Sequence, residues 1–441
     1  MDNKNYDVVI IGAGLSGLVA AYTLSSFGVK CCLLEKNSKI GGGNISFENE
    51  LGDIFDSGFH ALDDMRSVMT NKLFRKVINQ ECIRVKLKRG IYIGGELIDY
   101  NSPVEEWPAS ISSKISISSE DEMSGDVTFE KISKIFGSEF ATFCEDEIFN
   151  SYPSEVRSVL EGRDRKHKFN LIYPWFFPKV KKSVAISDSY TEWENYHNSM
   201  REKDQYVLYP KDNGFYGFIE GMFDHIDKKY CDVFLECGEL NINMDDKYQC
   251  TGISTKLLNI SAENYFWCAP FFGLAAKLKL PMPEGIAQTL VLGSFRFNGD
   301  LNSSYHEILV GDKSHKINRI SFPGNIRKSK NNLVQVEFFY PTDEINMDVD
   351  AWRTCWVESL RRMNIIELEE VESFRFDIQA KGMVTKTPLN EISEKYSGLI
   401  SNVGSNFFVP FVNAGPENIN RLVPEVISRA LSYVINEWRG S

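Results

Sequence analysis

Three glycines near the amino terminus, Gly12, Gly14 and Gly17, follow the spacing G-x-G-x-x-G, which is typical of a loop that touches a pyrophosphate. The first permits a tight turn, the second lets the backbone approach the phosphates, and the third lets a helix pack closely on a strand. Glu35 lies 18 residues after Gly17. A carboxylate at this spacing accepts hydrogen bonds from ribose hydroxyls and repels a 2′-phosphate, so the pattern predicts a dinucleotide other than NADP.

The elements that would position these glycines can be recognised on both sides of them. Residues 8–11 are all apolar, as expected of a parallel strand that is buried on both faces. Residues 18–24 indicate a helix, and residues 29–36 indicate a second strand that ends near Glu35. The uncharged run 8–29 has the length of a signal peptide or a membrane span, but its four glycines and the mixed charges before it argue against both. We therefore interpret it as a cofactor loop.

Composition excludes several function classes. The 441 residues suffice for two domains, and 43% hydrophobic with 25% charged residues is ordinary for a soluble globular protein. The net charge of −12 argues against nucleic acid as a partner, because phosphate contacts need a basic face. The nine cysteines contain no C-x-x-C pair and the six histidines show no zinc-like spacing. We expect reduced thiols, no bound metal and a cytoplasmic location.

The segment after Glu35 resembles a known group of proteins. Glu35-Lys36 is followed by Gly42-Gly43-Asn44 and then by Phe55-Asp56-Ser57-Gly58. This order resembles the start of the FAD-binding flavoproteins that include flavin amine oxidases, protoporphyrinogen oxidase, phytoene desaturases and UDP-galactopyranose mutase. Residues 206–222, 263–278 and 398–431 resemble later segments of the same group, so the resemblance extends over the whole chain.

The resemblance implies FAD as the cofactor and an α/β fold. A Rossmann-type, glutathione-reductase-like FAD-binding domain would comprise residues 1–100, 205–275 and 385–441. A second, α+β substrate-binding domain built on an antiparallel sheet would comprise residues 100–205 and 275–385. The residues implied to contact the cofactor are Gly12, Ala13, Gly14, Leu15, Ser16, Gly17, Glu35, Lys36, Gly42, Gly43, Asn44, Ser57, Gly58, Phe59, His60, Gly404, Ser405, Asn413, Asn418 and Ile419.

The activity implied by the resemblance is that of an FAD-dependent oxidoreductase, similar to amine oxidases and protoporphyrinogen oxidase, which passes a hydride from a small organic substrate to flavin N5. The alternative is a non-redox enzyme similar to UDP-galactopyranose mutase, acting on a nucleotide sugar. Ser405 stands where the mutase branch has an arginine, which favours the oxidoreductase. A third hypothesis is a scaffold protein in which the flavin is only structural.

Two residues are candidates for a catalytic role. His60 ends the stretch "SGFH", which resembles the mutase segment that places a histidine beside the flavin. Arg319 begins an alternating segment and could point towards a substrate carboxylate or phosphate. The structural alternatives are a satisfied histidine within the FAD-binding domain and a surface salt bridge, respectively.

Three other stretches stand out. Residues 163–182 combine basic and aromatic side chains, which suits a packed segment with basic flanks, a wall that contacts an anionic substrate, or a shallow membrane contact. Residues 110–124 are rich in serine and predict a surface linker, whereas Trp352 and Trp356 in 348–365 predict a core-facing helix. The partner we expect is a small-molecule substrate, and the sequence is compatible with an anionic one. It is also compatible with peripheral membrane contact and with a homo-oligomer, and we expect no transmembrane segment.

Overall fold

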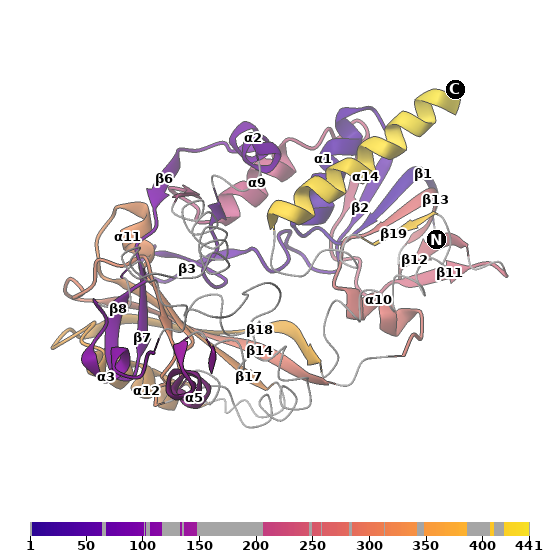
Figure 1. The fold of residues 1–441 in the computed structure, drawn as a ribbon. Helices are drawn as coiled ribbons and strands as arrows, with labels where there is room; N and C mark the ends of the chain where they lie inside the picture. Colours follow the sequence, from indigo (N-terminus) through magenta and orange to yellow (C-terminus); the bar gives the residue numbers. More distant parts are fainter. Residues whose placement is uncertain are drawn as a thin grey trace.

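A mixed sheet built around β1 (Asp2–Ile11) carries the glycine loop in the computed structural model (Figure 1). β1 lies between β2 (Cys31–Leu34) and β13 (Leu258–Trp267) and runs parallel to both. β10 (Cys231–Phe234) pairs in parallel with β2, and β19 (Phe407–Phe408) does so with β13. β12 (Cys250–Ser254) and β11 (Asn241–Met244) extend the sheet in antiparallel orientation.

The structure describes residues 2–63, 68–100, 102, 106–116, 133–134, 136–147, 206–246, 249–256, 258–281, 285–312, 314–341, 348–385, 406–409 and 419–440. The basic and aromatic stretch 163–182, the later part of the predicted linker at 117–124, and the predicted cofactor residues Gly404, Ser405, Asn413 and Asn418 lie outside these ranges.

Both faces of the first sheet are covered, which explains why residues 8–11 are apolar without alternation. Helices α1 (Leu15–Ser26), α2 (Val68–Val77), α9 (Tyr216–Asp224) and α14 (Ile419–Gly440) gather on one face, where Val8 and Ile10 are buried. Val9 and Ile11 face the opposite core, to which α10 (Phe271–Lys277) contributes. The predicted strand, helix and second strand around the glycines are therefore confirmed.

The cysteines behave as small hydrophobic residues. Cys31 packs in one core and its neighbour Cys32 in the other, because successive side chains of a strand point to opposite faces. None of the nine cysteines, which all lie within the described ranges, forms a disulfide bond.

A second, largely antiparallel sheet lies beside the first (Figure 1). Its strands, in spatial order, are β18 (Val371–Thr385), β14 (Gly285–Phe297), β17 (Leu333–Pro341), β16 (Arg319–Ser321), β15 (Glu307–Val310), β7 (Arg89–Ile93) and β8 (Glu96–Asp99). One face is apolar and packs against α12 (Val349–Arg362), in which Trp352 and Trp356 are buried. The predicted core-facing helix is thereby confirmed, and so is the predicted combination of a Rossmann-type domain with an antiparallel sheet.

Smaller elements connect the two sheets. The hairpin of β3 (Ser46–Glu48) and β4 (Ile54–Asp56) follows the glycine cluster at 41–43. A three-stranded sheet contains β5 (Leu62–Asp63), β9 (Tyr206–Pro210) and β6 (Cys82–Lys86). Three further short helices within the described ranges are α3 (Ala109–Ser112), α5 (Ser138–Glu147) and α11 (Pro323–Arg327).

Two details differ from the sequence-based expectations. The division into domains stays a prediction. Its boundary at residue 100 assigns residues 89–99 to the FAD-binding domain. In the structure these residues belong to the second sheet, because β7 pairs in parallel with β15. The predicted linker also begins as helix α3, in which Ile111 is buried; the serines around this isoleucine obscured its role in packing.

We predict that Gly293→Ala destabilises the second sheet against α12. A Cβ at this position would lie 2.4 Å from Cζ3 of Trp356 and 2.9 Å from Cγ2 of Val336. Overpacking of this kind typically costs about 1–3 kcal/mol of the free energy of unfolding, measured by urea titration. Gly273→Ala is the control: its Cβ would meet only Cζ2 of Trp267, at 3.9 Å, and should leave stability unchanged or slightly increased. Equal stability of the two variants would contradict the packing at Gly293.

Candidate dinucleotide site

The loop between β1 and α1 brings the predicted glycines into close backbone contact. Gly12 has φ +99°, a conformation that glycine adopts without strain, and it turns the chain into α1. A Cβ on Gly17 would lie 1.8 Å from the carbonyl oxygen of Gly12, so no side chain fits there. Gly14 caps the helix in an extended conformation, and the first turn of α1 contains neither an acidic residue nor a capping side chain. The positive end of α1 is therefore available to an anion.

Glu35 lies at the carboxyl end of β2, as the sequence predicts. Its Oε2 accepts a hydrogen bond from the backbone N–H of Ala13 at 2.8 Å, and its Oε1 accepts one from Asn37 N–H at 2.9 Å. The carboxylate is only 8% exposed, so its orientation is determined by these two bonds. Each carboxylate oxygen retains capacity for a further donor, such as a ribose hydroxyl.

The second glycine cluster lies against the first. Gly41 donates its N–H to the carbonyl oxygen of Ala13 at 2.8 Å and forms an isolated parallel bridge with Gly14. A Cβ on Gly42 would lie 3.3 Å from Cα of Gly14, whereas one on Gly43 would meet nothing within 4 Å. The structure thus brings together two loops that are separate in the sequence and whose exposed backbone is free of side chains.

Three further residues that the sequence predicts to contact the cofactor, Ser57, Lys36 and Ile419, lie in different surroundings. Ser57 is buried and its hydroxyl donates to the carbonyl oxygen of Gly43, which joins the Ser57–His60 loop to the glycine loops. Lys36 instead directs its ammonium group to Glu239 at 2.6 Å; with Lys277 it lowers the pKa of that exposed carboxylate to about 2. Ile419 is the first residue of α14, which packs on α1.

A carboxylate from the second sheet holds the Ser57–His60 loop. Glu337 Oε1 accepts a hydrogen bond from the N–H of Phe59 at 2.8 Å, and the side chain is 1% exposed. Gly58 has φ +96°, and a Cβ there would lie 3.3 Å from Oε2 of Glu337. His60 lies beside Phe215, with ring centroids 5.6 Å apart. The loop is therefore fixed between the two sheets.

Arg319 forms an ion pair within the protein. Its Nε and Nη2 donate to the two oxygens of Glu337 at 2.9 and 2.7 Å, and its guanidinium lies 5.6 Å from the ring centroid of Phe59. Burial opposes both charges, but mutual attraction outweighs it: the pKa of Arg319 is raised and that of Glu337 is lowered. The salt-bridge hypothesis therefore describes Arg319 better than the predicted contact with a substrate anion, although the salt bridge is partly buried rather than superficial.

The face of the second sheet that is turned towards the β3–β4 hairpin and the Ser57–His60 loop is rich in charge. Arginines on this face each pair with a carboxylate: Arg89 with Glu307, Arg296 with Asp53, Arg319 with Glu337, and Arg375 with Asp377. On the same face, Gln335 donates through Nε2 to the carbonyl oxygen of Asp56 at 2.7 Å. Polar contacts thus connect the two sheets.

Asp56 connects several segments beneath the loops. Its carboxylate accepts hydrogen bonds from the hydroxyls of Tyr209 and Ser46 and from the N–H of Phe215. Burial raises its pKa even though these bonds favour the ionised form. The residue therefore joins β4, β9 and the start of α9 at one point.

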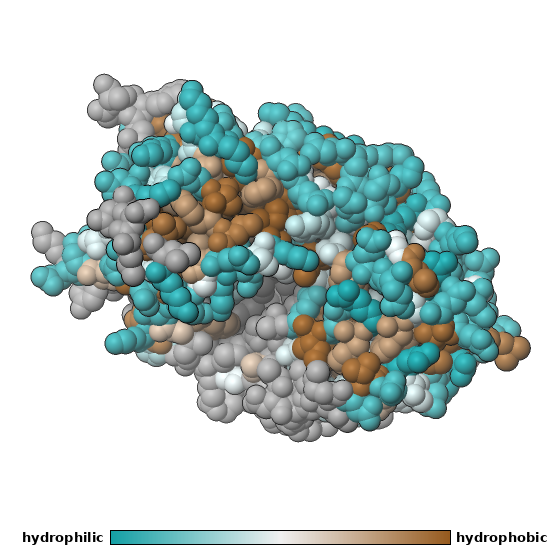
Figure 2. Space-filling model, turned by 180° about the vertical axis from the view of Figure 1, so that it is seen from behind, coloured by the Kyte–Doolittle hydropathy of each residue, from teal (hydrophilic) through white to brown (hydrophobic). Residues whose placement is uncertain are grey.

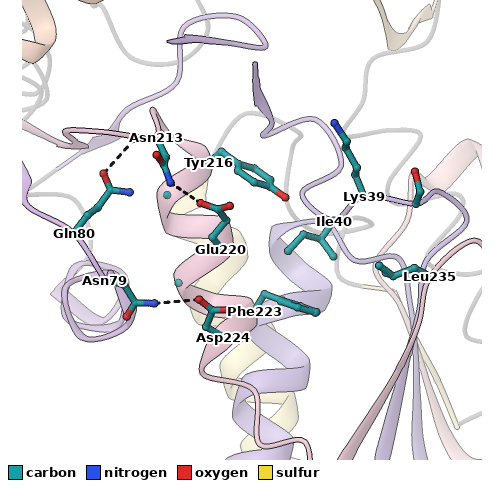
Figure 3. Close-up of a pocket in the computed structure, with 13 residues that line it drawn as sticks. Lys39, Ile40, Asn79, Gln80, Asn213, Tyr216, Glu220, Phe223, Asp224 and Leu235 are labelled. Atoms are coloured by element: carbon teal, nitrogen blue, oxygen red, sulfur yellow. Dashed lines mark hydrogen bonds between the residues drawn. The ribbon is translucent and has the colours of Figure 1, made fainter. Parts of the chain in front are cut away.

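A pocket of about 510 Å³ adjoins the glycine loops (Figure 3). Tyr216 extends from α9 towards Lys39 and Ile40, and a Cβ on Gly41 would lie 3.2 Å from its ring. The carboxylates of Glu220 and Asp224 line the pocket and accept hydrogen bonds from the amides of Asn213 and Asn79, respectively. No residue of the second sheet lines it, so this pocket is not the space between the two sheets.

Sequence reasoning missed the residues that hold the loops. Glu307 begins the otherwise apolar β15, and Gln335 and Glu337 occupy alternate positions of β17; these polar positions were the signal that could have identified a charged sheet face. Tyr209 and Tyr216 carried no such signal, because aromatic residues are common in any core.

The surface bears on membrane contact through the distribution of its hydrophobic residues. Viewed from behind, it is mostly hydrophilic, with hydrophobic residues gathered in separate areas (Figure 2). Among the helices that the structure describes, none combines the length and the apolar character needed to cross a bilayer. Peripheral membrane contact and self-association stay predictions.

Comparison with known sequences identifies the amino-terminal segment. Residues 10–77 match the model of an NAD(P)-binding Rossmann-like domain. The chain is 45% identical over 56 residues to 4,4′-diapolycopene oxygenase of Methylomonas, and 42% identical over 52 residues to flavin-containing amine oxidase A of Sus scrofa. These matches cover 13% and 12% of this chain, and only 11% and 10% of the respective relatives.

Comparison with solved structures covers nearly the whole chain. A reduced UDP-galactopyranose mutase aligns with a TM-score of 0.70 at 14% identity, over 99% of this chain and 96% of the other. A putative protoporphyrinogen oxidase from Exiguobacterium aligns with a TM-score of 0.70 at 13% identity, over 99% and 100%. A putrescine oxidase aligns with a TM-score of 0.59 at 12% identity, over 98% and 100%. The chain thus has the fold shared by these flavoproteins, with a Rossmann-like unit at its amino terminus, which confirms the resemblance seen in the sequence.

Proposed function

We propose that the protein is an FAD-dependent oxidoreductase that oxidises a small organic substrate. The residues around the β1–α1 loop fit such a cofactor: a helix start without an acidic side chain, two glycine clusters in backbone contact, and a carboxylate at the end of β2. Bound FAD would supply the electron acceptor, taking a hydride at N5. The protein's own contribution is binding, orientation and the exclusion of water.

Residues of both sheets would contribute to binding and orienting the cofactor and the substrate. The first turn of α1 would bind the pyrophosphate, and Glu35 would orient the adenosine ribose. The Ser57–His60 loop would lie beside the flavin ring, where His60 would contact either the cofactor or the substrate. The second sheet would cover the ring, since its charged face is turned towards this loop.

One observation favours the oxidoreductase over a mutase-like activity. A nucleotide sugar needs cationic side chains for its diphosphate, but Arg89, Arg296, Arg319 and Arg375, on the sheet face that would cover the flavin, each already pair with a carboxylate. The likeness in fold to UDP-galactopyranose mutase keeps the mutase-like, non-redox activity as the second candidate. In the described part of this face these four ion pairs contribute no net charge, so they have little attraction for a highly charged anion.

We predict that Gly17→Ala weakens FAD binding by about tenfold to hundredfold. The new Cβ would overlap the carbonyl oxygen of Gly12, at 1.8 Å, so α1 must move away from the turn that would bind the pyrophosphate. Titration of the apoprotein with FAD, followed by flavin fluorescence, measures the change. Gly273→Ala, which meets no close neighbour, should bind FAD as the wild type does. Unchanged FAD affinity of the Gly17 variant would exclude this loop as the binding site.

The substrate class can be tested by absorption spectroscopy of the FAD-loaded protein under anaerobic conditions. We expect bleaching of the flavin band by at least one member of a panel of primary and secondary amines and other hydride donors. Bleaching identifies an electron donor and supports the oxidoreductase. A UDP-sugar that perturbs the spectrum without bleaching, followed by turnover only with pre-reduced flavin, would replace the proposal by the mutase-like activity. Failure of the wild type to bind added FAD would refute both.

A further inference from the structure

A row of alternating charges crosses neighbouring strands of the second sheet. Arg89 on β7 pairs with Glu307 on β15, and Glu307 Oε2 lies 4.0 Å from Nη1 of Arg319 on β16. Arg319 in turn forms its two-bond ion pair with Glu337 on β17. We call these residues the charge row. Its carboxylates are buried, with Glu307 3% and Glu337 1% exposed.

The charge row ends on the Ser57–His60 loop, which lies between β4 and β5. Glu337 accepts the N–H of Phe59, and the backbone of Gly58 comes so close to its carboxylate that a methyl group would lie 3.3 Å from Oε2. The positive charge that His60 carries when protonated also helps to lower the pKa of Glu337, so this side chain and the carboxylate are electrostatically coupled. The final residue of the row therefore contacts the loop that would lie beside the flavin.

Stability alone does not explain a buried row of this kind. Desolvation of paired charges cancels most of their attraction, and apolar residues of similar size often stabilise a core at least as well. The ion pair fixes the orientation of the carboxylate, because a guanidinium that donates two hydrogen bonds to it allows only one geometry. Here that orientation presents Oε1 to the N–H of Phe59.

We propose that Glu337, oriented by Arg319, is a positioning residue that fixes the Ser57–His60 loop, and with it His60, against the flavin. This inference rests on the proposed FAD-dependent function. The charge row contains equal numbers of cations and anions, so removal of one carboxylate leaves a positive charge next to the loop. A reduced flavin carries more negative charge than an oxidised one, so the extra positive charge favours reduction.

The test is Glu337→Gln in the full-length, FAD-loaded protein. The amide keeps an acceptor for Phe59 but loses the charge that orients it. We expect about tenfold weaker FAD binding in a fluorescence titration. We also expect the midpoint potential, measured by equilibrium reduction against a reference dye, to rise by about 30 mV, which is a tenfold change for a two-electron couple.

Arg296→Gln is the matched control. It removes the ion pairs of Arg296 with Asp53, in the β3–β4 hairpin, and with Glu372, and neither carboxylate belongs to the Ser57–His60 loop. Its FAD affinity should match that of the wild type, and its potential should not rise, because this change removes a positive charge rather than a negative one. The double variant Glu337→Gln with Arg319→Gln restores charge balance, so its potential should return towards the wild-type value while its FAD binding stays weak.

Several outcomes would overturn the inference. One is wild-type affinity and potential in Glu337→Gln; another is an equal change in Arg296→Gln, which would indicate a general loss of stability. If Glu337→Gln does not fold, Glu337→Asp decides: it keeps the charge but shortens the side chain, so weak FAD binding with an unchanged potential supports the positioning role, and wild-type binding refutes it. A wild-type protein that binds no FAD refutes the proposed function instead, so the two failures are distinguishable.

Discussion

The close approach of Gly17 to the carbonyl oxygen of Gly12 is the constraint on which the candidate site depends. It allows α1 to start directly at the end of β1, and it leaves the amino-terminal turn of the helix open towards the carboxyl edge of the sheet. The same edge receives Glu35 from β2 and the second glycine cluster from the next loop. Because the contact between Gly12 and Gly17 is made by backbone atoms, a side chain on Gly17 would push the helix away from the strand.

Polar contacts attach the second sheet to the segment between residues 53 and 59. Glu337, Gln335 and Arg296 each reach a segment between residues 53 and 59. An apolar interface would bury more hydrophobic surface, but it would tolerate small shifts between the sheets. Hydrogen bonds and ion pairs lose much of their strength when geometry changes, so polar contacts hold the loop in one place. A flavoenzyme gains from this precision, because hydride transfer depends on the distance between the reacting atoms.

The two faces of the second sheet show how one strand can serve both packing and function. On β17, Val334, Val336 and Phe338 face the tryptophans of α12, whereas Gln335 and Glu337 face the loops. The apolar face supplies stability, and Gly293 leaves the space that Trp356 fills. The charged face can then contain groups that cost desolvation energy, because the opposite face compensates for them.

The sequence by itself determined the local units of this protein. The apolar run 8–11, the glycine spacing and Glu35 sufficed to predict a strand, a loop, a helix and a second strand, because short-range sterics decide these features. The helical spacing of Trp352 and Trp356 likewise identified the helix that covers the second sheet. The resemblance carried by the first 60 residues extended these units to the whole fold.

Only the tertiary structure decided which charged residues meet. Arg319 could have faced a substrate, but its partner Glu337 lies on the neighbouring strand and becomes a neighbour only when β16 and β17 pair. The contact of Glu337 with Phe59 joins residues 278 positions apart, and the assignment of 89–99 to the second sheet depends on β7 pairing with β15. Alternation along a strand shows which face a polar residue lies on, but it does not identify the partner, because the partner belongs to a segment that is distant in the sequence.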